Sequence, residues 1–308
     1  MTSVTSTRDF LVLLDGRHLC YEIYGDAYAN ATVFYHHGLP ASRVEASAYD
    51  QVARQSNIRL VGVDRPGMGR STFQPNRRLL DWPTDLLALA DHLNVDRFAV
   101  LGLSGGGPYV LACLHQIPTS RCVGGAIVAG MYPVNLGLAG MMLQNRLAFS
   151  CAAWFPWVVE KASDFLMGGV ARDTEHPERL EKTLSDSFKN KPGIDRTVWE
   201  HNERGIRTAI TESKREALCD GSRGAAQETG IFGTDWGFKL NDLAVDSGGL
   251  VLWHGGLDVN IPVAMARKAS ELIDGAELRV SEDDGHISMV VSKSDEVMAA
   301  LTRMLFTT

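Results

Sequence analysis

The chain has few cysteines, and they are arranged without a pattern. Its five cysteines include no C-x-x-C pair, so neither a disulfide framework nor a thiolate metal site is expected. They are Cys20, Cys113, Cys122, Cys151 and Cys219. The longest early apolar run, residues 10–14, is too short for a secretory signal. A reducing compartment fits both observations, and we expect a cytoplasmic protein.

Long apolar runs and excess positive charge are also lacking. A membrane-spanning helix needs about 18 or more apolar residues without charge. Residues 126–143 come closest, but proline, asparagine and glycines interrupt them. The net charge of −7 disfavours a surface that attracts phosphate backbones or anionic lipid. We therefore expect no nucleic-acid or membrane partner, and the pattern indicates no oligomeric state.

What the chain does have is a regular alternation of short apolar runs and helical patterns. Its 308 residues, 45% of them hydrophobic, suffice for one large domain or two ordinary ones. Predicted strands cover residues 10–14, 19–23, 32–36, 59–63, 98–103, 123–129, 250–254 and 277–280, and predicted helices cover 42–55, 84–93, 262–273 and 295–305. The first two strands flank an Asp15-Gly16 turn and predict a hairpin. Ser294 is the expected N-cap of the last helix.

Most of these strands are apolar on both faces, which predicts a mostly parallel sheet covered by helices on both faces. Between residues 134 and 236 the helical period dominates, and this length exceeds any ordinary loop. We therefore divide the chain into three parts. Residues 1–133 and 237–308 are expected to form the two parts of an α/β core, and residues 134–236 an inserted helical cap.

A candidate nucleophile lies at the end of the predicted strand 98–103. Residues 102–106 are G-L-S-G-G, which matches the pattern G-x-S-x-G, and a helical pattern follows. In the strand–turn–helix called the nucleophile elbow, small neighbours let the serine hydroxyl project from a sharp turn. Ser104 is therefore the candidate nucleophile.

A serine hydroxyl needs a base, and the base needs a third group to orient it. In chain order the acid and the histidine should follow the serine, each in a loop after a late strand. Asp258 follows the predicted strand 250–254, and His286 follows the predicted strand 277–280. We expect Ser104, Asp258 and His286 to act together.

Acyl transfer also needs N–H donors aimed at the developing oxyanion. The N–H of Gly105, directly after the serine, is one candidate. The loop after the predicted strand 32–36 is H-G-L-P, in which Pro40 has no N–H and Gly38 lets the backbone turn. The second expected donor is the backbone N–H of Leu39.

Together these elements resemble the α/β-hydrolase superfamily. The resemblance rests on residues 37–40, on D-R-P-G-M-G-R-S at 64–71, on the Ser104 elbow, and on Asp258 with His286. It spans nearly the whole chain and implies the α/β-hydrolase fold with a cap inserted after the sixth strand. It also implies that Asp64 is scaffold, since residues 64–71 are similar to the family's structural turn.

Departures from subfamily patterns narrow the activity. A serine nucleophile disfavours the haloalkane dehalogenases and epoxide hydrolases of this fold, which use aspartate. The H-G-L-P loop differs from the H-G-G-P-G of proline iminopeptidases and from the H-G-G-G of hormone-sensitive-lipase-like esterases.

The segment 134–236 is expected to select the substrate. Its apolar residues are Met141, Met142, Phe149, Trp154, Phe155, Trp157, Phe165, Met167 and Trp199. Most should pack helices together, and some should roof the pocket over Ser104, which favours a hydrophobic small-molecule substrate. The basic residues Lys189, Lys191 and Arg196 are expected on a solvated face.

Three functions remain open at this point. The first is a serine hydrolase that cleaves an ester, thioester or lactone through an acyl-enzyme on Ser104. The second is a cofactor-free lyase, cyclase or carbon–carbon bond hydrolase in a biosynthetic pathway, using the same residues. The third is a ligand-binding receptor that retains them. No metal or organic cofactor is expected for any of the three.

Overall fold

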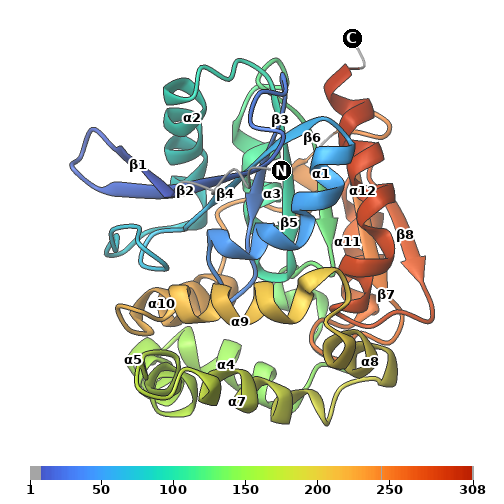
Figure 1. Ribbon diagram of the computed structural model, residues 1–308. Helices are drawn as coiled ribbons and strands as arrows, with labels where there is room; N and C mark the ends of the chain where they lie inside the picture. The colour runs from blue at the N-terminus through green and yellow to red at the C-terminus, as the bar shows by residue number, and fades with distance from the viewer. Residues whose placement is uncertain (1–7, 244, 307–308) are drawn as a thin grey trace.

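The computed structural model describes residues 8–243 and 245–306, and its centre is an eight-stranded sheet (Figure 1). The strand order is β1-β2-β4-β3-β5-β6-β7-β8. The strands are β1 (Arg8–Val12), β2 (His18–Gly25), β3 (Ala31–His36), β4 (Ile58–Val63), β5 (Phe98–Leu103), β6 (Cys122–Val128), β7 (Leu250–Gly255) and β8 (Glu277–Ser281). The pairs β1–β2 and β2–β4 are antiparallel, and all other neighbours are parallel. The predicted hairpin and the mostly parallel sheet are therefore confirmed.

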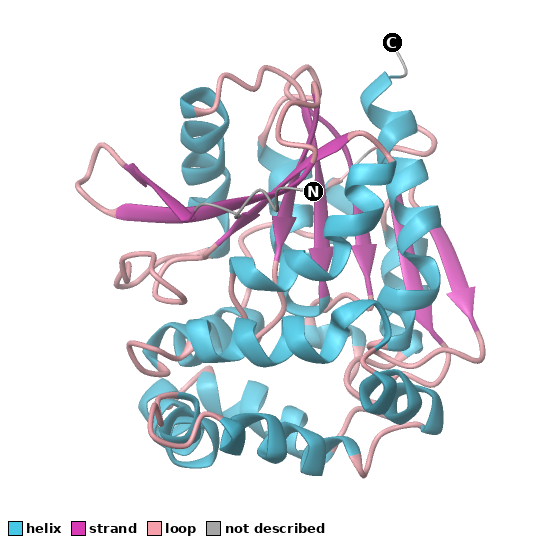
Figure 2. Ribbon diagram, viewed as in Figure 1, coloured by secondary structure: helices cyan, strands magenta, loops and turns pink. Residues whose placement is uncertain are grey.

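Helices cover both faces of this sheet (Figure 2). They are α1 (Asp50–Gln55), α2 (Trp82–His92), α3 (Gly107–Gln116), α4 (Leu143–Ala152), α5 (Pro156–Ser163), α6 (Gly169–Ala171), α7 (Glu178–Phe188), α8 (Gly193–His201), α9 (Ile206–Ala217), α10 (Arg223–Phe232), α11 (Val263–Leu272) and α12 (Ser288–Phe306). Short 3₁₀ or π turns are η1 (Arg43–Tyr49), η2 (Leu79–Asp81), η3 (Ser104–Gly106), η4 (Val134–Leu136), η5 (Asp164–Gly168), η6 (Glu203–Gly205) and η7 (Leu240–Asp242).

Alternation along the strands builds two cores. Phe34 of β3 packs with side chains of α2, α3 and α11 on one face of the sheet. Its neighbours Val33 and Tyr35 pack with side chains of α1 and α12 on the other. Successive strand side chains point to opposite faces, so a strand that is apolar at every position needs a helix layer on each side. The expected α/β fold class is thereby confirmed.

Two helix predictions differ from the structure. The predicted helix 42–55 is split, because its first half is the 3₁₀ segment η1. The N–H of Arg43 at its start donates to the Asp64 carboxylate. The predicted start of the last helix is wrong, since α12 begins at Ser288, and Ser294 lies inside the helix with its hydroxyl on the Val291 carbonyl. That early start depends on a distant carboxylate, described with the site below.

Seven helices, α4 to α10, lie between β6 and β7 in the sequence, within the segment 134–236. In Figure 1 they gather at the end of the sheet toward which the parallel strands point. Helices α9 and α10 lie next to the sheet, with α4, α5 and α7 beyond them. That these helices form a separate unit stays a prediction. No helix in the described residues is long and apolar enough to cross a membrane.

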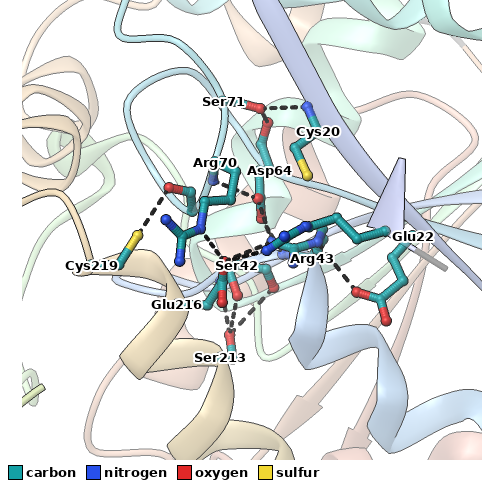
Figure 3. Close-up of polar contacts among 12 residues, drawn as sticks. Cys20, Glu22, Ser42, Arg43, Asp64, Arg70, Ser71, Ser213, Glu216 and Cys219 are labelled. Carbon is teal, nitrogen blue, oxygen red and sulfur yellow. Dashed lines mark hydrogen bonds and ion pairs between the residues drawn. The ribbon is translucent and has the colours of Figure 1, made fainter. Parts of the chain in front are cut away.

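A buried ionic network fixes α9 to the core (Figure 3). Asp64, directly after β4, is fully buried and accepts the Arg43 guanidinium at 2.7 Å. Its carboxylate also accepts the backbone N–H groups of Arg43 and Arg70 at 2.6 and 2.9 Å. Arg70 in turn donates to Glu216 of α9 at 2.7 Å, and Arg43 lies 3.5 Å from the same carboxylate. These bonds agree with a scaffold role for Asp64.

Removing the charge at the centre of this network should destabilise the protein. In Asp64→Asn the buried Arg43 guanidinium loses its closest counter-charge and keeps those of Glu22 at 3.2 Å and Glu216 at 3.5 Å. We expect this loss of a charged hydrogen-bond partner to cost about 1–3 kcal/mol in the free energy of unfolding. Urea unfolding followed by circular dichroism measures the change. The control is Asp186→Asn, whose exposed pair with Lys189 should contribute less than about 1 kcal/mol. Equal stability of Asp64→Asn and the wild type would contradict the analysis.

Candidate active site

Ser104 occupies a sharp turn between β5 and α3. Its φ of 52° lies in the left-handed region, which is uncommon for a residue with a side chain. A Cβ at Gly102 would lie 2.6 Å from the Gly106 carbonyl oxygen, and one at Gly106 would lie 2.0 Å from the His36 carbonyl oxygen. Both positions therefore need glycine, because the turn presses against its own strand and against β3.

His286 and Asp258 meet at the ends of β8 and β7. The Nδ1 of His286 lies 2.7 Å from Oδ2 of Asp258. The other oxygen of Asp258 accepts the N–H groups of Asn260 and Ile261 at 2.8 and 3.0 Å. The buried ring of His254 lies 3.5 Å from the Asp258 carboxylate and bonds the Ile261 carbonyl.

The negative charge of Asp258 and the positive charge of protonated His286 stabilise each other. Burial disfavours the charge on both groups, but the His286 imidazole holds the pKa of Asp258 below its ordinary value. Burial likewise acts to lower the pKa of His286, yet the Asp258 carboxylate outweighs it, so that this pKa lies above its ordinary value. A carboxylate that stays charged can fix the imidazole's tautomer and stabilise its cation.

Ser104 and His286 line one cavity of about 420 Å³. Within the described residues no hydrogen bond joins the Ser104 hydroxyl to His286. Such bonds are often long before a substrate is bound. The structure thus brings all three residues of the expected group to one place, with the single direct bond between His286 and Asp258.

The two expected N–H donors lie beside Ser104. A Cβ at Gly105 would lie 3.2 Å from the Leu39 nitrogen, so the two backbones are close neighbours. Both residues line the cavity. Within residues 8–243 and 245–306, the Leu39 N–H has no acceptor.

The groups around Leu39 are all bonded. Gly38 donates its N–H to the buried Glu45 carboxylate at 2.7 Å. Arg65 donates to the His37 and Gly38 carbonyls at 2.6 and 2.9 Å. Lys214 donates to the Pro40 carbonyl at 3.0 Å. The loop is therefore held by several hydrogen bonds, while the Leu39 N–H is left without an acceptor among the described residues.

Asp195, which sequence analysis did not single out, holds the histidine loop. It lies in the first turn of α8, within residues 134–236, and is 1% exposed. Its Oδ2 accepts the N–H of His286 at 2.9 Å, and its Oδ1 accepts those of Ile287 and Ser288 at 3.1 and 2.9 Å. A carboxylate on the first N–H groups of a helix acts as an N-cap, so α12 begins at Ser288.

The roof of the cavity differs in part from the expectation. Of the apolar residues named for it, Phe149 and Met167 line the cavity. Trp154, Trp157 and Phe165 are 80%, 64% and 89% exposed. The three basic residues expected on a solvated face differ in their exposure. Lys189 and Arg196 are exposed, but Lys191 lines the cavity. For Lys191 the expectation is wrong.

Comparisons with known proteins agree with this fold. A model of the "Alpha/beta hydrolase family" matches residues 33–300, so the chain belongs to that family. It is 24% identical over 306 residues to a "Probable proline iminopeptidase" of Leptolyngbya boryana, covering 92% of this chain and 91% of the relative. The expected α/β-hydrolase resemblance is confirmed at the level of the family.

Solved structures share the fold across their whole length. An esterase from Exiguobacterium antarcticum superposes with a TM-score of 0.66 and 18% identity, covering 98% of this chain and all of that one. An enol-lactonase from Burkholderia xenovorans LB400 gives a TM-score of 0.64 at 18% identity, covering 97% of this chain and all of the other.

The Asp195 contacts give a direct test. In Asp195→Asn the neutral amide accepts the three N–H groups less well, and we expect a loss of about 1–3 kcal/mol in the free energy of unfolding. Hydrogen exchange at the amides of residues 286–288 should accelerate. Glu200→Gln, at an exposed position of the same helix, is the control and should change stability by less than about 0.5 kcal/mol. Unchanged exchange at residues 286–288 would refute the capping role.

Proposed function

We propose that the protein is a serine hydrolase that cleaves an ester, thioester or lactone of a hydrophobic small molecule through an acyl-enzyme on Ser104. The observation that carries the proposal is one cavity lined by both Ser104 and His286, with His286 bonded to a buried Asp258 at 2.7 Å. Nucleophile, base and orienting acid are the three groups that acyl transfer to a serine requires.

Each step assigns a role to a named group. His286 takes the proton of the Ser104 hydroxyl as its oxygen attacks the substrate carbonyl. Asp258 keeps Nδ1 of the imidazole protonated, so that Nε2 is the base, and stabilises the cation that forms. The N–H groups of Leu39 and Gly105 bind the oxyanion.

The tetrahedral intermediate then collapses. The bond to the leaving alkoxide or thiolate breaks as His286 returns the proton to it, and the acyl group remains on Ser104. Water, deprotonated by His286, attacks this acyl-enzyme. The bond to the Ser104 oxygen then breaks as His286 returns the proton to that oxygen, which releases the acid and restores the enzyme.

The cavity's lining supports a substrate with a hydrocarbon body. Much of the lining is apolar and comes from both the core and the inserted helices: Leu39, Leu103, Met131, Ala148, Phe149, Val159, Met167, Leu184, Phe188, Ile210, Phe232, Ile261 and Ile287. Binding sites for hydrophobic small molecules have this composition, with a few polar groups that fix orientation. The esterase and lactonase likenesses agree with ester chemistry in this fold.

Labelling and turnover test the nucleophile. A fluorophosphonate probe should label the wild type, and p-nitrophenyl esters of increasing chain length should turn over repeatedly. In Ser104→Ala the label should disappear and kcat should fall by about 10⁴-fold or more. Ser270→Ala, on α11, is the control and should keep both. Labelling without ester turnover would redirect the assignment to lyase, cyclase or receptor function, and a folded protein that takes no label would refute an activated serine.

The pH profile tests the pair. Only neutral His286 can accept the serine proton, so kcat/KM should fall as pH drops through its pKa. Because Asp258 outweighs burial, that pKa lies above its ordinary value of about 6.5. In Asp258→Asn burial loses its main opposition, and the midpoint should move to lower pH while kcat drops by about 10⁴-fold. An unmoved midpoint in this variant would contradict the role of Asp258.

A further inference from the structure

Two lysines line the cavity that contains Ser104 and His286. Lys191 precedes α8 and Lys214 lies in α9, so both belong to the inserted helices. Both are partly buried. The Lys191 ammonium contacts the Asn260 side-chain oxygen and the Met142 sulfur, and the Lys214 ammonium donates to the Pro40 carbonyl at 3.0 Å. Lys191 is therefore held by two neutral groups and Lys214 by one.

Neither ammonium has a carboxylate within 4 Å in the described part of the chain. Burial lowers the pKa of both groups. For Lys214 the Glu45 carboxylate opposes this shift and the charge of Lys191 adds to it, and for Lys191 the carboxylates of Asp258 and Asp195 oppose it, but burial outweighs them in both cases. Both ammonium groups line the same cavity. A charged ammonium in a largely apolar cavity is costly unless an anion compensates it.

The carboxylates nearby already have other partners. Glu45 lines the cavity, but it accepts the Gly38 N–H at 2.7 Å and the Tyr35 hydroxyl at 2.9 Å. Asp258 is bonded to His286. Asp195 accepts three backbone N–H groups. Each acts on a lysine only from a distance.

Part of the cavity lining is apolar, and a small inorganic ion would leave that part of the cavity unfilled. Phe149, Met167 and Phe188 line it together with the lysines. No arginine is among the described lining residues. An ammonium group binds a carboxylate or a phosphate as a point charge. A carboxylate costs less to bring into a partly apolar cavity, because it carries one negative charge where a phosphate monoester carries nearly two.

We infer that the substrate is an anionic ester or lactone, with a free carboxylate separated from the reacting carbonyl by a hydrocarbon chain or ring. Lys191 and Lys214 bind that carboxylate, and the apolar lining holds the body of the molecule. A half-ester of a dicarboxylic acid has this form. The inference rests on the proposed hydrolase function and narrows its substrate class.

Matched substrates test it. Mono-p-nitrophenyl esters of adipic, pimelic and suberic acid are compared with p-nitrophenyl hexanoate, heptanoate and octanoate, which have the same number of acyl carbons. With two ammonium groups as partners, the carboxylated ester should have a kcat/KM about tenfold or more above its neutral counterpart at one chain length at least. In a cavity without an anion site the carboxylate would instead be penalised.

The variants use the ratio of these two kcat/KM values as readout. Lys214 holds the Pro40 carbonyl beside Leu39, so its substitution changes absolute rates as well. In Lys191→Met and in Lys214→Met the ratio should fall by about tenfold, since one ionic contact is lost. Lys189→Met is the control, because Lys189 is exposed and outside the cavity, and it should keep the ratio.

A measurement on the wild type alone keeps the inference testable if the lysine variants fail to fold. Monomethyl suberate should protect Ser104 of the wild type from fluorophosphonate labelling at concentrations at which dimethyl suberate does not. A kcat/KM ratio of one or below at every chain length, or equal protection by the two suberates, would overturn the inference. If esters are nevertheless turned over through Ser104, the hydrolase function stands. Failure to label Ser104 or to cleave either ester series would overturn both.

Discussion

The direction of the parallel strands is the constraint on which the site depends. Because β3, β5, β7 and β8 run the same way, their carboxyl ends meet at one edge of the sheet, and the loop after each contributes one group. These are Leu39 after β3, Ser104 after β5, Asp258 after β7 and His286 after β8. Residues separated by more than 240 positions in the chain thereby line or flank one cavity. The two-sided apolar packing that fixes the strands also fixes this convergence.

Much of this could be predicted from the sequence, because it depends on local patterns. Strands that are apolar at every position, the G-x-S-x-G turn, and an aspartate and a histidine after late strands can each be identified within a short window. The start of α12 could not, because the cap that sets it, Asp195, lies 93 positions before Ser288. Lys191 was misassigned for a similar reason, since acidic and basic neighbours resemble a solvated face until the fold turns one of them inward.

The helices between β6 and β7 contribute charged groups that pair with residues of the sheet's loops. Glu216 of α9 pairs with Arg70, and Glu228 of α10 is fully buried between Arg65 and Arg77. Since Arg65 also holds the carbonyls of His37 and Gly38, a carboxylate from α10 supports the loop that carries Leu39. The geometry around the serine is therefore shared between core and insertion.

The short stretch from Lys191 to Asp195 shows why the segment between β6 and β7 cannot be exchanged without regard to the loops of the sheet. At one end of this stretch, Lys191 contacts Asn260 in the loop that carries Asp258. At the other end, Asp195 accepts three backbone N–H groups of the loop that carries His286. A transplanted insertion that changed pocket shape alone would leave both loops without these partners. Any replacement for this segment would therefore have to supply an equivalent pair of contacts, whereas helices of the cavity wall that make no such bonds carry no such requirement.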